Sequence, residues 1–79
     1  MKVIIEKGSK FNTVIIEDAD IDDFNSILTA YSFNEIYDLN MLGSKYSFYY
    51  IDAGNDTLKD LSLKETDENV IIREFKDGV

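Results

Sequence analysis

The residues of this chain that could do the most chemistry are seven carboxylates in a stretch without any basic residue. The stretch runs between Lys10 and Lys45, and its acids are Glu17, Asp18, Asp20, Asp22, Asp23, Glu35 and Asp38. Carboxylates can bind a metal ion, transfer a proton or attract a positively charged partner. The chain contains no His and no Cys, so the side chain best suited to proton transfer near neutral pH and the thiolate metal ligands are both missing.

The first possibility to consider is a calcium-binding site. Asp18, Asp20 and Asp22 follow the spacing with which a calcium-binding loop begins. The sixth position of such a loop requires glycine and is Asp23 here, and the twelfth requires glutamate and is Thr29. We therefore expect no metal site and no cofactor.

Enzymatic activity is also not expected. The chain has no nucleophile elbow, no phosphate-binding loop and no dinucleotide-binding fingerprint, and its four glycines fall at turns or at the end. A pair of carboxylates can hydrolyse glycosides, but 79 residues are too few to build the cleft that this reaction needs. The sequence indicates a non-enzymatic protein without catalytic residues.

The acidic stretch has two interpretations. Asp20, Asp22 and Asp23 precede or begin an expected helix, where a carboxylate is stabilised by about 0.3–1 kcal/mol through the helix dipole. That explanation does not account for Glu17, Asp18, Glu35 and Asp38, nor for the absence of Lys and Arg from the stretch. The other interpretation is a binding face, because carboxylates three or four residues apart on a helix stand about 5–6 Å apart. This spacing is comparable to that of neighbouring phosphates, so the row could occupy a basic groove that normally holds nucleic acid.

The expected partner follows from this charge. A face that carries most of the net charge of -8 repels nucleic acid, so we expect no direct binding to nucleic acid, and we expect no membrane as partner. We expect docking on a larger basic protein, in particular on a nucleic-acid-binding surface, with inhibition as the consequence. The seven acids would supply the attraction, and Tyr49 would supply a contact of the kind that tyrosine makes at interfaces.

An aromatic segment carries the alternative function. In a strand over residues 45–52, Tyr46, Phe48 and Tyr50 share one face, and Tyr49 and Ile51 share the other. Large side chains of this kind are needed in a small core, which explains one face. The other face, or an exposed sheet edge, could serve a small accessory, assembly or toxin-immunity protein as its binding surface.

The hydrophobic pattern predicts the elements that position these side chains. Residues 2–7 and 11–17 are expected to form two strands joined by a tight turn. A helix should follow, with Asp20 as its N-cap and Asp23 at the capping-box position. Its inward stripe is predicted to comprise Ile21, Phe24, Ile27, Leu28 and Tyr31.

The second half of the chain is predicted to be mostly strands. Residues 34–42 fit either a strand or a short helix, and we favour a strand in which Tyr37, Leu39 and Met41 share a face. That strand would form a hairpin with residues 45–52, and residues 57–63 and 70–76 would follow as strands. The prediction is a single α+β domain over residues 1–79, with a mostly antiparallel sheet in the order β-β-α-β-β-β-β and one helix packed on one face.

Composition places the chain in a broad class. The apolar run after Met1 is too short for a signal-peptide core or a membrane span, so we expect a cytoplasmic protein. In size, charge and lack of catalytic residues it is similar to the small acidic inhibitors that phages carry against bacterial defence, anti-CRISPR proteins among them. For such a protein the compartment would be the host cytoplasm. The similarity covers no motif and assigns no residue.

Overall fold

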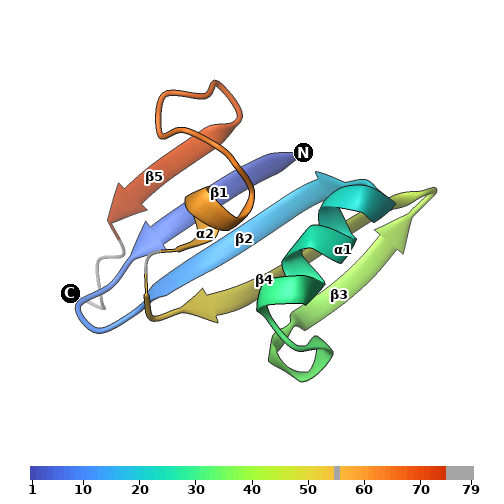
Figure 1. Cartoon of the computed structure of the whole chain (residues 1–79), viewed down its shortest axis with the longest axis horizontal. Coiled ribbons are helices and arrows are strands. Elements are labelled where there is room, and N and C mark those ends of the chain that lie inside the picture. The colour runs from blue at the N-terminus through green and yellow to red at the C-terminus, as the bar shows by residue number, and fades with distance from the viewer. Residues whose placement is uncertain (55, 75–79) are drawn as a thin grey trace.

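The chain forms one five-stranded sheet with its helices on one side (Figure 1). The computed structural model describes residues 1–54 and 56–74, and these form β1 (Lys2–Lys7), β2 (Asn12–Ala19), α1 (Ile21–Ala30), the 3-10 turn η1 (Phe33–Glu35), β3 (Tyr37–Leu42), β4 (Lys45–Asp52), α2 (Thr57–Asp60) and β5 (Val70–Glu74). The strand order is β3-β4-β2-β1-β5, and every neighbouring pair is antiparallel except β1 with β5. The predicted α+β class, with a mostly antiparallel sheet and one main helix, is confirmed.

Helix α1 begins as its sequence predicts. The Asp20 carboxylate accepts a hydrogen bond from the backbone N–H of Asp23 at 2.9 Å, which satisfies a first-turn donor that has no partner within the helix. Phe24 and Ile27 are buried against the sheet. Ile21 was expected to face inward but is 50% exposed, because it lies at the first helical position, beyond the edge of the core.

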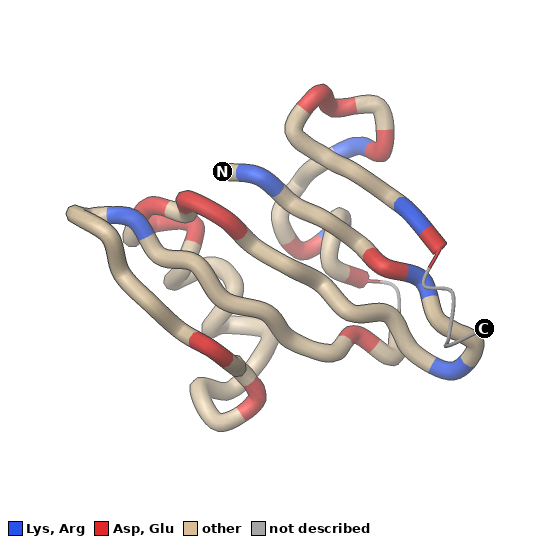
Figure 2. The backbone as a smooth tube through the Cα atoms, turned by 180° about the vertical axis from the view of Figure 1, so that it is seen from behind, with Lys and Arg blue, Asp and Glu red and all other residues tan. Residues whose placement is uncertain are grey.

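The core lies between the sheet and the helices. Alternate residues of the inner strands point to this side, and their neighbours point to the opposite side. The buried core comprises Val3, Ile5, Val14, Ile16, Ala19, Phe24, Ile27, Phe48 and Tyr50. In Figure 2, seen from behind, the sheet lies in front and both helices lie behind it. We call the surface that faces this viewer the open face.

The ambiguous segment 34–42 is resolved as η1 followed by strand β3, so the favoured strand is confirmed. The predicted alternation, in which Tyr37, Leu39 and Met41 share one face, is wrong. Asp38 has a φ of 52°, and the pairing register shifts between Tyr37 and Asn40. This β-bulge places Tyr37 opposite Tyr49 on the open face and Met41 opposite Tyr46 on the helix side. Tyr37 and Met41 therefore do not share a face.

The strand predicted over residues 57–63 is wrong, because the segment begins with the short helix α2. The cause is a buried carboxylate five residues upstream. Oδ2 of Asp52 accepts hydrogen bonds from the backbone N–H of Thr57 at 3.1 Å and from its hydroxyl at 2.8 Å. A helix-terminal N–H that would otherwise lack a partner is thereby satisfied. The last strand begins at Val70 as predicted, and the part of its predicted range beyond Glu74 lies outside the described residues.

Candidate protein-binding site

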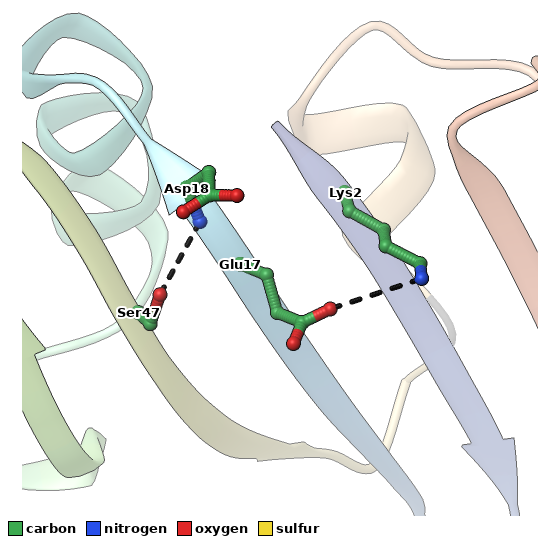
Figure 3. A network of polar contacts seen from close by, with 4 residues as sticks. All are labelled: Lys2, Glu17, Asp18 and Ser47. Carbon is green, nitrogen blue, oxygen red and sulfur yellow. Dashed lines mark hydrogen bonds and ion pairs between the residues drawn. The ribbon is translucent and has the colours of Figure 1, made fainter.

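Four of the predicted acids gather where β2 passes into α1. We call Asp18, Asp20, Asp22 and Asp23 the helix-start acids. Asp18 has a φ of 58° and lies in a second β-bulge, where the β2 register shifts between Ile16 and Ala19. Its backbone N–H donates to Oγ of Ser47 at 3.3 Å (Figure 3). Because a bulge redirects the strand, Ala19 returns to the core while the Asp18 side chain stays exposed.

Two of the helix-start acids have pKa values shifted in opposite directions. The hydrogen bond from the Asp23 backbone N–H holds the pKa of the Asp20 carboxyl below its ordinary value of 3.8, and nearby Lys45 acts in the same direction. Partial burial raises the pKa of the Asp23 carboxyl above 3.8, and the neighbouring charge of Asp20 adds to this. Ionised Asp20 therefore stabilises the fold above pH 3.8, and this contribution is lost as the pH falls through its lowered pKa. The Asp23 contribution has the opposite sign, because it is present at low pH and is lost as the pH rises through its raised pKa.

These shifts give a direct prediction. Changing Asp20→Asn keeps an N-cap acceptor but removes one carboxylate charge. In wild-type protein, carboxyl titration followed by NMR should show Asp20 titrating below 3.8 and Asp23 above it. In the variant, the pKa of Asp23 should fall toward 3.8 without reaching it, because its partial burial remains. An unchanged Asp23 titration would show that the two carboxylates do not interact.

Two of the three remaining acids of the stretch lie at the other end of α1. We call Glu35 and Asp38 the β3 acids, since they flank the start of β3. The Glu35 carboxylate accepts a hydrogen bond from the Ser32 hydroxyl at 3.1 Å. The ten residues of α1 span about 15 Å at 1.5 Å per residue, and this helix separates the two groups. Figure 2 shows them as distinct red segments with tan backbone between them. The stretch therefore forms two acidic groups rather than one continuous row.

Glu17, also predicted as part of the site, lies on the open face. It pairs with Lys2 from β1 at 4.0 Å, and both side chains are about half exposed (Figure 3). An exposed pair of this kind contributes about 0–1 kcal/mol. Glu17 is thus partly neutralised by Lys2. Among the helix-start acids, Asp20 has Lys45 as a nearby cation and Asp23 has the amino terminus.

Tyr49 lies in a row of apolar side chains that becomes visible only from the strand pairing. Strand pairing aligns Ile71, Ile4, Ile15, Tyr49 and Tyr37 across all five strands. We call this set the apolar row. The Tyr37 and Tyr49 rings stack with centroids 5.2 Å apart, and Ile4 is only 8% exposed although it lies outside the core cluster. Apolar residues on both faces of the first hairpin were the sequence signal for this row, but its course depends on strand pairing.

A hollow of about 280 Å³ opens at the other end of β4, lined among others by Ile5, Asp52, Thr57 and Ile72. It lies far along the sheet from the helix-start acids and is smaller than the range of about 300–1,000 Å³ typical of small-molecule sites. The predicted site residues do not line it.

The arrangement of the candidate residues can attract a cationic surface and offer apolar contacts beside it. Among the described residues, no group of three potential metal-ligating side chains is placed to hold an ion. None of the helices within residues 1–54 and 56–74 has the length and apolar character needed to cross a membrane. No protein-family model, curated protein or solved structure matches this chain.

Proposed function

We propose that this chain is a non-enzymatic binding protein that docks on a basic surface of a larger protein and blocks it. The observation that supports this most is the gathering of Asp18, Asp20, Asp22 and Asp23 at the start of α1. Three of them are exposed and Asp23 is partly so. A concentration of one sign of charge raises the rate at which an oppositely charged partner is encountered.

The partner surface proposed is one that normally binds nucleic acid. Such surfaces carry Lys and Arg spaced to meet phosphates. Asp20 and Asp23 are three residues apart at the helix start, and side chains with this spacing stand about 5–6 Å apart. The β3 acids provide a second anionic group about 15 Å away along α1, so the protein presents negative charge at two points. An inhibitor of the kind that phages carry against bacterial defence would use this property, and size, charge and composition support that version.

A charge-removing variant tests the proposal. The triple change Asp20→Asn, Asp22→Asn and Asp23→Asn keeps the cap and the side-chain shapes. We expect about a tenfold slower association with the partner at low salt and a flatter dependence on salt, because electrostatic steering is lost. Tagged wild-type protein would first capture the partner from a bacterial lysate at low salt. Elution with double-stranded DNA and with high salt would be compared, and association rates would then be measured with the purified partner.

A matched control removes the same number of charges elsewhere. Asp60→Asn, Glu65→Gln and Glu68→Gln change exposed side chains in or after α2. This variant should associate about as fast as wild type, since Asp60 lies near Tyr31, at the opposite end of α1 from the helix-start acids, and Glu65 lines the hollow at the other end of β4. Equal rates for wild type and both variants would refute the charge proposal, and a partner that DNA does not displace would refute the nucleic-acid-binding surface.

The apolar row favours a second candidate function, that of a small accessory, assembly or toxin-immunity protein that binds through its aromatic strand. Tyr49 is central to this row and is partly exposed between Ile15 and Tyr37. If this function holds, Tyr49→Ala should weaken binding by 2 kcal/mol or more, about the effect of a hot-spot tyrosine. The triple Asp→Asn variant would then bind as wild type does.

A further inference from the structure

Strand β3 lies at one edge of the sheet, and its outer side is uncovered by any described strand. Every one of its six residues is exposed. Of the nine large hydrophobic side chains that are exposed in the described residues, five fall between Phe33 and Leu42. Met41 is 61% and Leu42 is 82% exposed. Apolar surface is therefore concentrated along the one edge strand that is exposed throughout.

The backbone of β3 offers hydrogen bonds outward. Gly43 has a φ of 65°, while Ser44 has no positive φ, which is the pattern of a type II′ two-residue turn. Such a turn closes on a hydrogen-bonded pair, here Leu42 with Lys45. Pairs alternate along an antiparallel ladder, so the next pair, Met41 with Tyr46, is not hydrogen-bonded. The N–H and C=O of Met41 therefore point away from β4.

Devices that keep edge strands from pairing are sparse here. Natural edges are blocked by lysine, proline, charge or bulges. Residues 37–42 contain no Lys, Arg or Pro, and the bulge at Asp38 leaves the segment from Leu39 to Leu42 regular. The opposite edge differs, because β5 carries Arg73 and Glu74, and Arg73 is paired with Glu6 at 2.9 Å.

The two acidic groups lie near the two ends of this same edge. The β3 acids flank its start. At its other end the ring of Phe24, in the first turn of α1, stacks on Tyr46 with centroids 4.6 Å apart, and Tyr46 pairs with Met41. The helix-start acids therefore lie beside the end of β3. The six residues of β3 span about 20 Å, somewhat more than the length of about 15 Å of α1.

From these observations we infer that the β3 edge is a strand-addition site for an extended, basic segment of the partner protein. The segment pairs with the backbone of Leu39 to Leu42, covers Met41 and Leu42, and places Lys or Arg near each acidic group. This inference rests on the proposed function and specifies its mode of docking. Affinity would come from main-chain hydrogen bonds, and specificity from alternate side chains and end charges.

A second copy of the chain is a poorer occupant of the edge. Antiparallel pairing of two β3 strands about a two-fold axis brings the acids at the start of one strand beside the helix-start acids of the other. Like charges placed together oppose association, and each copy carries a net charge of -8. A basic segment meets the same acids with favourable charge.

The test uses the full ¹⁵N-labelled chain and a synthetic peptide as the probe. The peptide has two lysines at each end and four alternating valines and threonines between them. At low salt we expect it to slow hydrogen exchange of the Met41 N–H, with no change at Ile71 in β5. A second peptide, N-methylated at alternate residues, keeps the charges but cannot pair with an edge, and we expect it to bind at least tenfold more weakly.

Variants of the protein give an independent readout. Met41→Pro removes the outward N–H while leaving the β4-facing hydrogen bonds in place, and edge strands tolerate proline at such positions. We expect at least tenfold weaker peptide binding. Met41→Val is the matched control and should bind as wild type, and circular dichroism verifies that both variants fold.

The possible outcomes distinguish strand addition at β3 from binding by electrostatic attraction alone. Equal binding of both peptides, or no binding of either, overturns strand addition at β3, whereas the proposed function is decided separately by the triple Asp→Asn variant and the captured partner. Protein dimerisation through β3, seen by sedimentation and abolished by Met41→Pro, would also overturn the inference. Slowed exchange at Met41 together with loss of binding on N-methylation supports it.

Discussion

Replacing Phe24 with alanine is expected to remove about 3–5 kcal/mol from the free energy of unfolding. Phe24 is only 6% exposed, and its ring contacts Tyr46 at 4.6 Å and Phe48 at 5.3 Å between centroids. Stability of about 0.05–0.15 kcal/mol per residue gives a chain of 79 residues about 4–12 kcal/mol in total. The substitution therefore removes a large share of the stability, and urea unfolding followed by circular dichroism would measure it.

The matched control for this prediction is Phe33→Ala. Phe33 is the same residue type, but it lies in η1 and is 62% exposed. Its replacement should change stability by no more than about 0.5 kcal/mol. If Phe24→Ala costs as little as Phe33→Ala, the ring stack does not anchor α1 to the sheet, and the placement of the helix-start acids beside β3 would lose its structural basis.

Much of the fold could be predicted from the sequence because its signals are local. The period of the apolar residues and the cap at Asp20 determine α1, and the Gly43-Ser44 turn determines the hairpin of β3 and β4. The segment 57–63 could not be predicted in this way. Leu58 and Leu61 are three apart and suit a helical turn, whereas Leu61 and Leu63 suit a strand. The Asp52 carboxylate favours the helix by accepting hydrogen bonds from Thr57, and the sequence does not show that this carboxylate is buried at the end of β4.

The candidate site could be predicted as a set of residues but not as an arrangement. The sequence shows that Lys and Arg are missing between Lys10 and Lys45. It does not show that α1 separates the acids into two groups, since that depends on how the helix packs. Two bulges, at Asp18 and Asp38, also change which face later residues occupy. A bulge is defined by the register of two paired strands, so the period of a single strand does not reveal it.

Strand β3 shows how residue type and position in the sheet together determine a candidate site. Leu39, Met41 and Leu42 are ordinary strand residues in the sequence, and their importance follows from the position of β3 in the strand order β3-β4-β2-β1-β5. The same order places the paired charges of Arg73 and Glu6 toward the other edge. Two edges of one sheet thus differ in apolar surface and in charge, and this difference makes β3 the more favourable edge for a basic strand.

Changing Asp52→Ala is expected to reduce the free energy of unfolding by about 3 kcal/mol. Asp52 is 4% exposed, and its carboxylate accepts hydrogen bonds from the backbone N–H of Thr57, the Thr57 hydroxyl and the backbone N–H of Gly54. Removing it leaves buried donors without an acceptor, and each such donor costs about 1–3 kcal/mol. For a domain of this size, 1 kcal/mol corresponds to about 4–8 °C in Tm, so thermal unfolding should show a fall of about 12–24 °C.

The conservative variant Asp52→Asn removes the charge of this side chain while keeping its shape and most of its hydrogen bonds. Its amide oxygen can still accept from both Thr57 donors, and its amino group meets the Gly54 N–H, so one hydrogen bond is lost and the shape is kept. We expect a loss of about 1 kcal/mol. The Thr57 hydroxyl also accepts a hydrogen bond from Tyr50 at 3.1 Å, so the network joins α2 to the core side of β4. Equal losses for the alanine and asparagine variants would mean that the carboxylate stabilises α2 by its charge, and that the hydrogen bonds to Thr57 are not the reason why residues 57–60 are helical.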